Sequence, residues 1–151
     1  MRSAIDLVLA FFAFLAIGGC GNNGNGGNAG GGDPRLEGAY TLIASELKGN
    51  RENEAERAKI YTFTGNRMIP PNGKQEDALT VSCDPSKSPC EIDFSKTESN
   101  GKIDTLHGIY KIENDTLTLC LRKSDNPADR PREFKTTSDS KDMLWVLKKN
   151  K

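Results

Sequence analysis

Residues 106–122 read LHGIYKIENDTLTLCLR, and this stretch decides the predicted fold. Apolar side chains alternate with others on both sides of Asn114-Asp115, a pair that favours a tight two-residue turn. Counting outward from this turn sets the register of a β-hairpin. One face pairs Ile112 with Leu117, Tyr110 with Leu119, and Gly108 with Leu121. The other pairs Lys111 with Thr118, Ile109 with Cys120, and His107 with Arg122. We expect the first, apolar face to point into a core.

The rest of residues 35–150 carries similar short alternating segments separated by turn residues. Further strands are predicted at 38–46, 59–64, 67–69, 79–83, 90–94, 133–136 and 143–148. In the first of these, Tyr40, Leu42 and Ala44 share one parity. The polar stretch 50–58 lacks an apolar stripe, so at most a short helix is expected near 51–58. The predicted class is all-β, with an antiparallel barrel or strongly curved sheet of about eight strands.

A barrel of eight strands encloses a space that side chains can fill or that can hold one small ligand. Bulky aromatic residues are available for that space, and packing against one another is their first expected role. A cage for a small apolar ligand is the second expected role. The candidate ligand-binding residues of the interior are Tyr40, Phe63, Phe94, Tyr110 and Trp145.

The first residues are typical of an export signal. Arg2 precedes an apolar run of 11 residues at 7–17, too short for a membrane-spanning helix but suited to a signal peptide. The run ends in Gly18-Gly19-Cys20, which resembles the lipobox of bacterial lipoproteins. We therefore predict a signal peptide at 1–19 and lipidation of Cys20. Plain secretion with a free Cys20 is the alternative.

A tether and one domain are expected after the signal peptide. Residues 21–33 contain no apolar side chain larger than alanine, so residues 20–34 are expected to form a flexible tether from Cys20 to the domain at 35–151. Acyl chains on Cys20 would bind the protein to a membrane. The expected location is the cell envelope, anchored by lipid and facing the periplasm or the exterior.

The charge is balanced, with 21 Lys and Arg residues against 21 Asp and Glu residues. Without Arg2 and Asp6 of the signal peptide, the balance stays at 20 against 20. No basic excess is left to attract nucleic acid, so no nucleic-acid partner is expected.

Several motifs together resemble a known kind of domain. Leu36-Glu37-Gly38-Ala39-Tyr40 is similar to the opening of small lipocalin-like domains. Residues 108–120 (GIYKIENDTLTLC) and the later Arg130-Pro131-Arg132-Glu133-Phe134 follow in the order of an uncharacterised secreted domain abundant in planctomycete bacteria. The resemblance covers nearly all of residues 35–149. It implies export and a lipocalin-like barrel, and it implies no activity.

Three cysteines remain after Cys20. Cys83 and Cys90 flank a six-residue loop, and the oxidising exported compartment favours a disulfide between them. Cys120 lies on the hairpin face opposite the core and is expected to remain a free, partly covered thiol. No spacing among the cysteines and His107 resembles a metal site, so no metal ligands are predicted.

The sequence gives no catalytic motif, and no cofactor is expected. His107 would be only a diagonal neighbour of Cys120, and no carboxylate is paired with it by pattern, so a solvated surface histidine is the expected role. We therefore expect a non-enzymatic module that binds a small molecule or an envelope protein. The alternative is a thiol-dependent enzyme or redox protein that uses Cys120 and His107.

Overall fold

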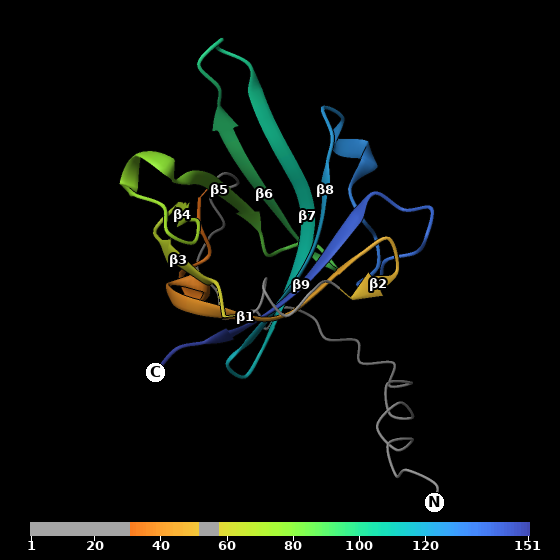
Figure 1. The fold of residues 1–151 in the computed structure, drawn as a ribbon, viewed down its shortest axis with the longest axis horizontal. Helices are drawn as coiled ribbons and strands as arrows, with labels where there is room; N and C mark the ends of the chain where they lie inside the picture. The colour runs from red at the N-terminus through yellow and green to blue at the C-terminus, as the bar shows by residue number, and fades with distance from the viewer. Residues whose placement is uncertain (1–30, 52–57) are drawn as a thin grey trace, which may run out of the picture.

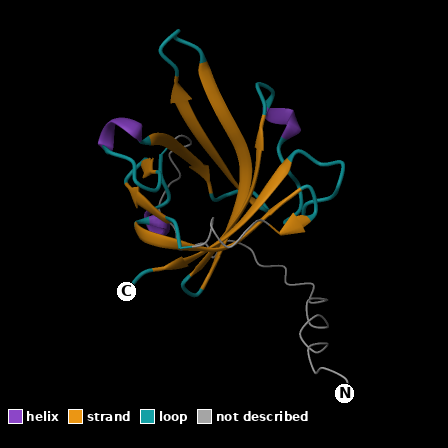
Figure 2. Cartoon of the chain, viewed as in Figure 1, coloured by secondary structure: helices purple, strands orange, loops and turns teal. Residues whose placement is uncertain are grey.

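In a computed structural model, the described residues, 31–51 and 58–151, form an antiparallel β-barrel (Figures 1 and 2). The predicted signal peptide, Cys20 and most of the predicted tether lie outside the described residues. The elements in chain order are η1 (Pro34–Leu36), β1 (Gly38–Leu47), β2 (Asn50–Arg51), β3 (Ile60–Thr64), β4 (Arg67–Ile69), η3 (Gln75–Asp77), β5 (Leu79–Asp84), β6 (Cys90–Thr97), β7 (Ile103–Glu113), β8 (Thr116–Lys123), η4 (Pro127–Asp129) and β9 (Asp142–Lys149).

The strands follow one another around the barrel in chain order. Each strand from β3 to β9 pairs with the next, and β1 pairs with both β3 and β9, which closes a ring of eight strands. The additional strand β2 extends only the end of β1. The predicted all-β barrel of about eight strands is therefore confirmed, and closure leaves the ring without an open edge.

The hairpin of β7 and β8 has the predicted register. Ile112 faces Leu117, Tyr110 faces Leu119, and Gly108 faces Leu121. The leucines of this face are at most 1% exposed and belong to the hydrophobic core, as the sequence pattern requires. Alternation of side chains on a half-buried sheet thus predicted the register of this hairpin correctly.

Three parts of the sequence prediction need correction. The segment 133–136 is not a strand, and the chain crosses from β8 to β9 without adding one. Residues 50–51 form β2 instead of starting a helix, and residues 52–57 lie outside the described residues. A β-bulge shifts the register between Leu42 and Ala44, so the buried side of β1 continues at Ser45, and Ala44 does not share the face of Tyr40 and Leu42.

One end of the barrel is closed by the segment that precedes β1. Leu36 of η1 is 2% exposed and packs in the core. The hydroxyl of Tyr110 donates to a carboxylate oxygen of Asp33 at 2.6 Å, and the hydroxyl of Tyr40 donates to the backbone oxygen of Arg35 at 3.3 Å. These bonds satisfy polar groups that lie at the buried end of the ring.

Candidate functional site

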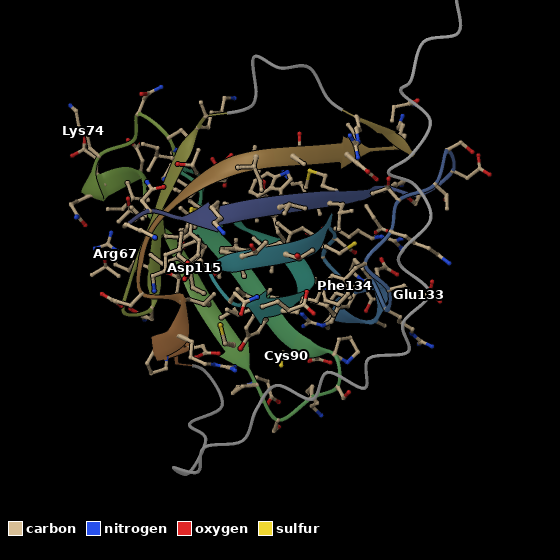
Figure 3. All side chains as sticks on the ribbon, turned by 90° about the horizontal axis from the view of Figure 1, so that it is seen from below. Arg67, Lys74, Cys90, Asp115, Glu133 and Phe134 are labelled. Carbon is tan, nitrogen blue, oxygen red and sulfur yellow. The ribbon has the colours of Figure 1, made fainter. Side chains whose placement is uncertain are left out.

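The interior of the barrel is filled by its aromatic side chains. Of the candidate ligand-binding residues, Tyr40, Phe63, Phe94 and Tyr110 are all at most 3% exposed, and Trp145 packs against the same core. Figure 3 shows side chains occupying the space that the strands enclose. The structure therefore brings these residues together as a packed core.

The rings are arranged as in other protein cores. Tyr40 and Phe63 have ring centroids 5.6 Å apart at an interplanar angle of 81°, and Phe63 lies 6.2 Å from Phe94. Tyr61 and Trp145 form a second pair at 5.1 Å. Edge-to-face ring pairs at these distances stabilise a core by more than the burial of their apolar surface alone.

A small recess remains at the end of the barrel opposite η1. It has a volume of about 210 Å³, and its apolar walls come from Leu79, Phe94 and Leu106. Charged side chains of Lys96, Glu98, Asp104 and Lys123 also line it. The volume is below the roughly 300–1,000 Å³ that is usual for ligand pockets.

The outer wall of the barrel carries a second layer over β6, β7 and β8. Residues 127–135, here called the strap, contact the outward faces of these strands; Figure 3 labels two of its residues, Glu133 and Phe134. The ammonium of Lys111 lies 5.6 Å from the ring centroid of Phe134. Ile109 points outward yet is only 1% exposed. Because of the strap, apolar side chains are buried on both the inner and the outer face of the β7–β8 hairpin.

Arg130 fastens the strap to the barrel. Its Nη1 donates to the backbone oxygens of Ile92 at 3.1 Å and Gly108 at 2.7 Å. Its Nη1 also lies 2.8 Å from Oδ1 of Asp93, and its Nη2 donates to Oδ2 of Asp93 at 3.1 Å. Nε lies 3.6 Å from a carboxylate oxygen of Glu91. A planar guanidinium has the donors to make all these contacts at once.

The predicted surface histidine is buried instead. His107 is 8% exposed, and its Nδ1 lies 3.0 Å from Oδ1 of Asp93, its cross-strand partner. Sequence reasoning did not pair these two residues, because the β6–β7 register depends on a connection with no two-residue turn signal. Asp93 therefore joins His107 to Arg130 in one polar cluster on the outer wall.

Cys120 is a free thiol, as predicted, but it is fully buried. It faces Ile109 in the register, and its Sγ lies 3.8 Å from the backbone oxygen of Lys135 on the strap. Burial raises its pKa to about 11. Because thiolate is the reactive form, Cys120 is a poor nucleophile.

The predicted disulfide between Cys83 and Cys90 is wrong for this structure, in which Cys83 is a buried free thiol. Cys83 faces Ile92 in the β5–β6 pairing, so Cys90 is a diagonal neighbour two positions away. Diagonal pairs lie roughly 7–8 Å apart, at or beyond the reach of a disulfide. Cys90 Sγ lies 3.6 Å from the backbone oxygen of Pro85.

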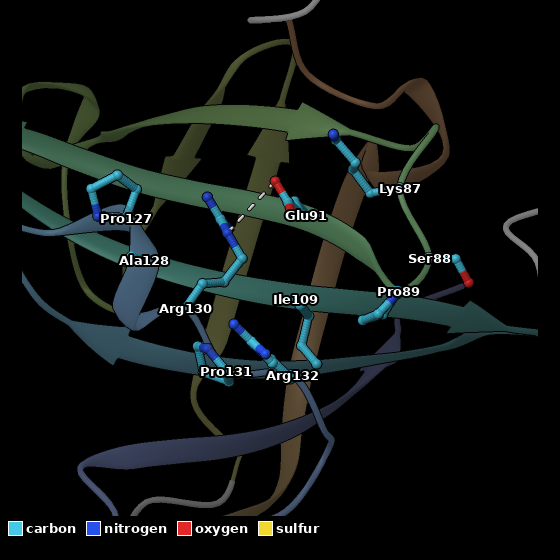
Figure 4. Close-up of a pocket in the computed structure, with 10 residues that line it drawn as sticks. All are labelled: Lys87, Ser88, Pro89, Glu91, Ile109, Pro127, Ala128, Arg130, Pro131 and Arg132. Carbon is cyan, nitrogen blue, oxygen red and sulfur yellow. Dashed lines mark ion pairs between the residues drawn. The ribbon is translucent and has the colours of Figure 1, made fainter.

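A groove lies where the strap meets the loop between β5 and β6. Its volume is about 490 Å³, and both segments contribute to its walls, as Figure 4 shows. The lining residues are Lys87, Ser88, Pro89, Glu91, Ile109, Pro127, Ala128, Arg130, Pro131 and Arg132. Sequence reasoning missed this groove, although Arg130-Pro131-Arg132 stood out as a motif.

The groove has an excess of positive charge. Three cations, Lys87, Arg130 and Arg132, line it together with one carboxylate, that of Glu91. Glu91 is paired with Arg130 (Figure 4, dashed line). Among the described residues, neither Lys87 nor Arg132 takes part in an ion pair or a hydrogen bond, and both are exposed. Both cations therefore lie outside any ion pair in this part of the chain. Hydrogen bonds from Ser86, followed by the charge of Lys87, lower the pKa of the nearby Asp84 carboxyl.

A second hollow of about 380 Å³ lies on the other side of the strap. It shares Ala128, Arg130, Pro131 and Arg132 with the groove. Its charges are largely matched, since Arg122 makes two hydrogen bonds to Asp142, at 2.7 and 3.0 Å. The described part of the chain contains no cluster of three or more His, Cys, Asp or Glu residues that could hold a metal ion.

The fold and site together define a closed antiparallel barrel with a filled interior and a groove on its outer wall. The chain matched no family model, no curated protein and no solved structure. In residues 31–51 and 58–151, no helix has the length and apolar character needed to cross a membrane.

Proposed function

We propose that this protein is an exported, lipid-anchored protein of the cell envelope whose barrel is a non-enzymatic binding module. We assign the binding surface to the outer-wall groove between the strap and the β5–β6 loop. One observation carries this assignment: aromatic side chains fill the interior, whereas the groove is open and within the size range of ligand pockets.

The sequence pattern supports the anchored state. A short apolar run ending in Gly18-Gly19-Cys20 precedes a glycine- and asparagine-rich stretch. Two or more acyl chains on Cys20 would hold the protein at a membrane without a transmembrane helix. Gly31 accepts a hydrogen bond from the backbone of Cys83, so the tether would comprise residues 21–30 and would span roughly 17 Å, which would hold the barrel clear of lipid head groups.

The environment of Cys120 supports a non-enzymatic role. Its thiol is buried, its pKa is raised, and the nearby His107 is engaged by Asp93. A nucleophilic dyad needs a thiol within hydrogen-bond reach of its base, and within residues 31–51 and 58–151 the thiol of Cys120 is hydrogen-bonded to the backbone of Lys135 instead. The thiol-enzyme alternative therefore has little support in the geometry.

The recess at the barrel mouth is a second candidate binding site, for a small apolar ligand. Leu79, Phe94 and Leu106 give it apolar walls, and its volume of about 210 Å³ would accept only a small molecule. The outer groove has the stronger support because it is larger and is lined by more cations than carboxylates.

Anchoring is tested by growing the native host with an alkyne-labelled fatty acid and recovering the protein. We expect label on the wild-type chain in the membrane fraction and none on Cys20→Ala. An unlabelled, soluble wild-type chain would overturn the anchored state.

Binding is tested separately by native mass spectrometry of the protein purified from its host. A bound mass that is retained by the wild type and lost when the groove is altered at Arg132 supports the binding module. A protein that carries no bound molecule, and whose groove binds none of the probes described below, would overturn the binding-module proposal.

A further inference from the structure

We infer that the outer-wall groove binds a small organic acid, with its carboxylate between Lys87 and Arg132 and its apolar body against the exposed rings of Pro89 and Pro127. This inference rests on the proposed function, because it names the ligand class of the same groove.

Charge is the first reason. Arg130 is fully used by two backbone oxygens, Asp93 and Glu91, so it balances the acidic groups beside the groove. Lys87 and Arg132 then remain as cations outside any ion pair of the described residues, on two different segments (Figure 4). An anion placed between them gains attraction from both sides without displacing an existing ion pair.

Positioning is the second reason. Arg132 follows Arg130 by two residues, and Arg130 is held by the barrel backbone. Pro131 lies between them and is buried, and its ring fixes the backbone φ there. The chain that carries Arg132 is thus held against the wall before any ligand arrives, which lowers the entropic cost of binding.

The lining next to these cations is the third reason. Pro89 and Pro127 line the groove with exposed rings, and Ile109 and Pro131 lie buried beneath them. Such a surface favours an apolar body, and a fully hydrated anion such as inorganic phosphate would leave it unused. A ligand with one carboxylate and an aromatic or branched aliphatic body fits both features.

The test uses two probes of nearly equal shape, 1-naphthoate and its neutral amide, 1-naphthamide. The protein is the full chain carrying Cys20→Ser, which removes the acylation site but leaves the core, all of it between Leu36 and Leu147. Backbone amide signals are followed by two-dimensional NMR during titration. We expect 1-naphthoate to shift the amide signals of the non-proline residues among 87–91, 109 and 127–132, and to bind about tenfold more tightly than the amide.

Matched variants separate the groove from the barrel mouth. Lys87→Gln and Arg132→Gln should each lower the affinity for 1-naphthoate by about two- to fivefold, which is the usual contribution of an exposed ion pair. The affinity for the amide should stay unchanged. Lys96 lies at the barrel mouth, so Lys96→Gln should change the affinity for neither 1-naphthoate nor 1-naphthamide.

Three results would overturn the inference. They are shifts confined to residues 79, 96, 104–106 and 123 at the mouth, equal affinity for acid and amide, and equal affinity of wild type and both groove variants. Shifts at the mouth, or amide binding in the groove without charge preference, would leave the binding-module proposal standing. No saturable binding of either probe would count against the inference, and the host-purified protein tests the wider proposal independently.

Discussion

The hydroxyl oxygen of Tyr110 lies 2.6 Å from a carboxylate oxygen of Asp33, a residue 77 positions earlier in the chain. Arg35 holds the same carboxylate, with Nε 3.0 Å from both oxygens and Nη2 2.6 Å from one of them. This contact joins the segment before β1 to the far strand β7. It is one of the hydrogen bonds that fasten the closed end of the barrel, with that of Tyr40 to Arg35.

Replacing Tyr110 by phenylalanine tests this bond. We expect Tyr110→Phe to lower the free energy of unfolding by about 1–3 kcal/mol, because a buried carboxylate loses a donor. Tyr40→Phe is the matched control, since it removes a longer, 3.3 Å bond to a neutral acceptor and should cost less. Urea denaturation measures both, and an equal loss in the two variants would contradict the assignment.

Stability at low pH should depend on Asp33. Burial acts to raise the pKa of Asp33, but hydrogen bonds from Arg35 and Tyr110 outweigh it and hold the pKa below its ordinary 3.8. A carboxyl with a depressed folded-state pKa stabilises the fold above its unfolded-state pKa, and that contribution is lost as the pH falls through the folded-state pKa. The free energies of unfolding of wild type and Asp33→Asn, measured by denaturation between pH 6 and pH 2, should converge as the pH falls. A difference in unfolding free energy that stays constant over this range would contradict this.

The strap should detach when Arg130 is truncated. Arg130→Ala removes hydrogen bonds to two barrel carbonyls and to Asp93, and we expect a loss of about 2–4 kcal/mol with faster amide hydrogen exchange in residues 127–135. Arg132→Ala is the control, because Arg132 makes no such bonds and should change stability by less than about 0.5 kcal/mol. Equal effects of the two variants would show that Arg130 does not fasten the strap.

Gly108 should tolerate no side chain. A Cβ there would lie 2.4 Å from Cδ2 of Leu121 and 2.7 Å from the backbone oxygen of Cys120. The second contact is with the backbone, which cannot rotate away, so we expect Gly108→Ala to lower the unfolding free energy by about 1–3 kcal/mol. Thermal denaturation measures this, and an unchanged Tm would mean that β7 and β8 are not paired as described.

The thiols of Cys83 and Cys120 should be inert while the protein is folded. Burial raises the pKa of each from 9.0 to about 11. Stability from keeping them protonated is fully present below pH 9.0 and is lost as the pH rises through about 11. A disulfide reagent at pH 8 should modify both thiols only after urea is added; rapid labelling of Cys120 in the native protein would revive the thiol-enzyme alternative.

Local alternation predicted the β7–β8 hairpin because its turn is two residues long, and every side chain of the hairpin is then placed by counting. The same reasoning failed at Ala44, where a β-bulge reverses the alternation of buried and exposed side chains. No residue near the bulge is of a type that predicts it. It also failed for Cys83 and Cys90, because the six-residue loop left their offset open and the observed register makes them diagonal neighbours.

The outer layer could not be predicted from strand patterns. The strap contains no regular strand, and its contacts join residues 92, 93, 108 and 130, which pattern reasoning cannot bring together. The one available signal was that His107, Ile109 and Cys120 share a face with too few charges for an exposed surface. That face is covered by the strap, and the groove exists because of this cover.

The central claim is that the barrel is filled and that its binding surface lies on the outer wall. Crystals soaked with 4-bromobenzoate test this most directly, because the anomalous signal of bromine locates the ligand. We predict a bromine peak in the groove beside Pro89 and Pro127, with the carboxylate between Lys87 and Arg132. A peak inside the ring, against Phe94 or Trp145, would contradict the claim.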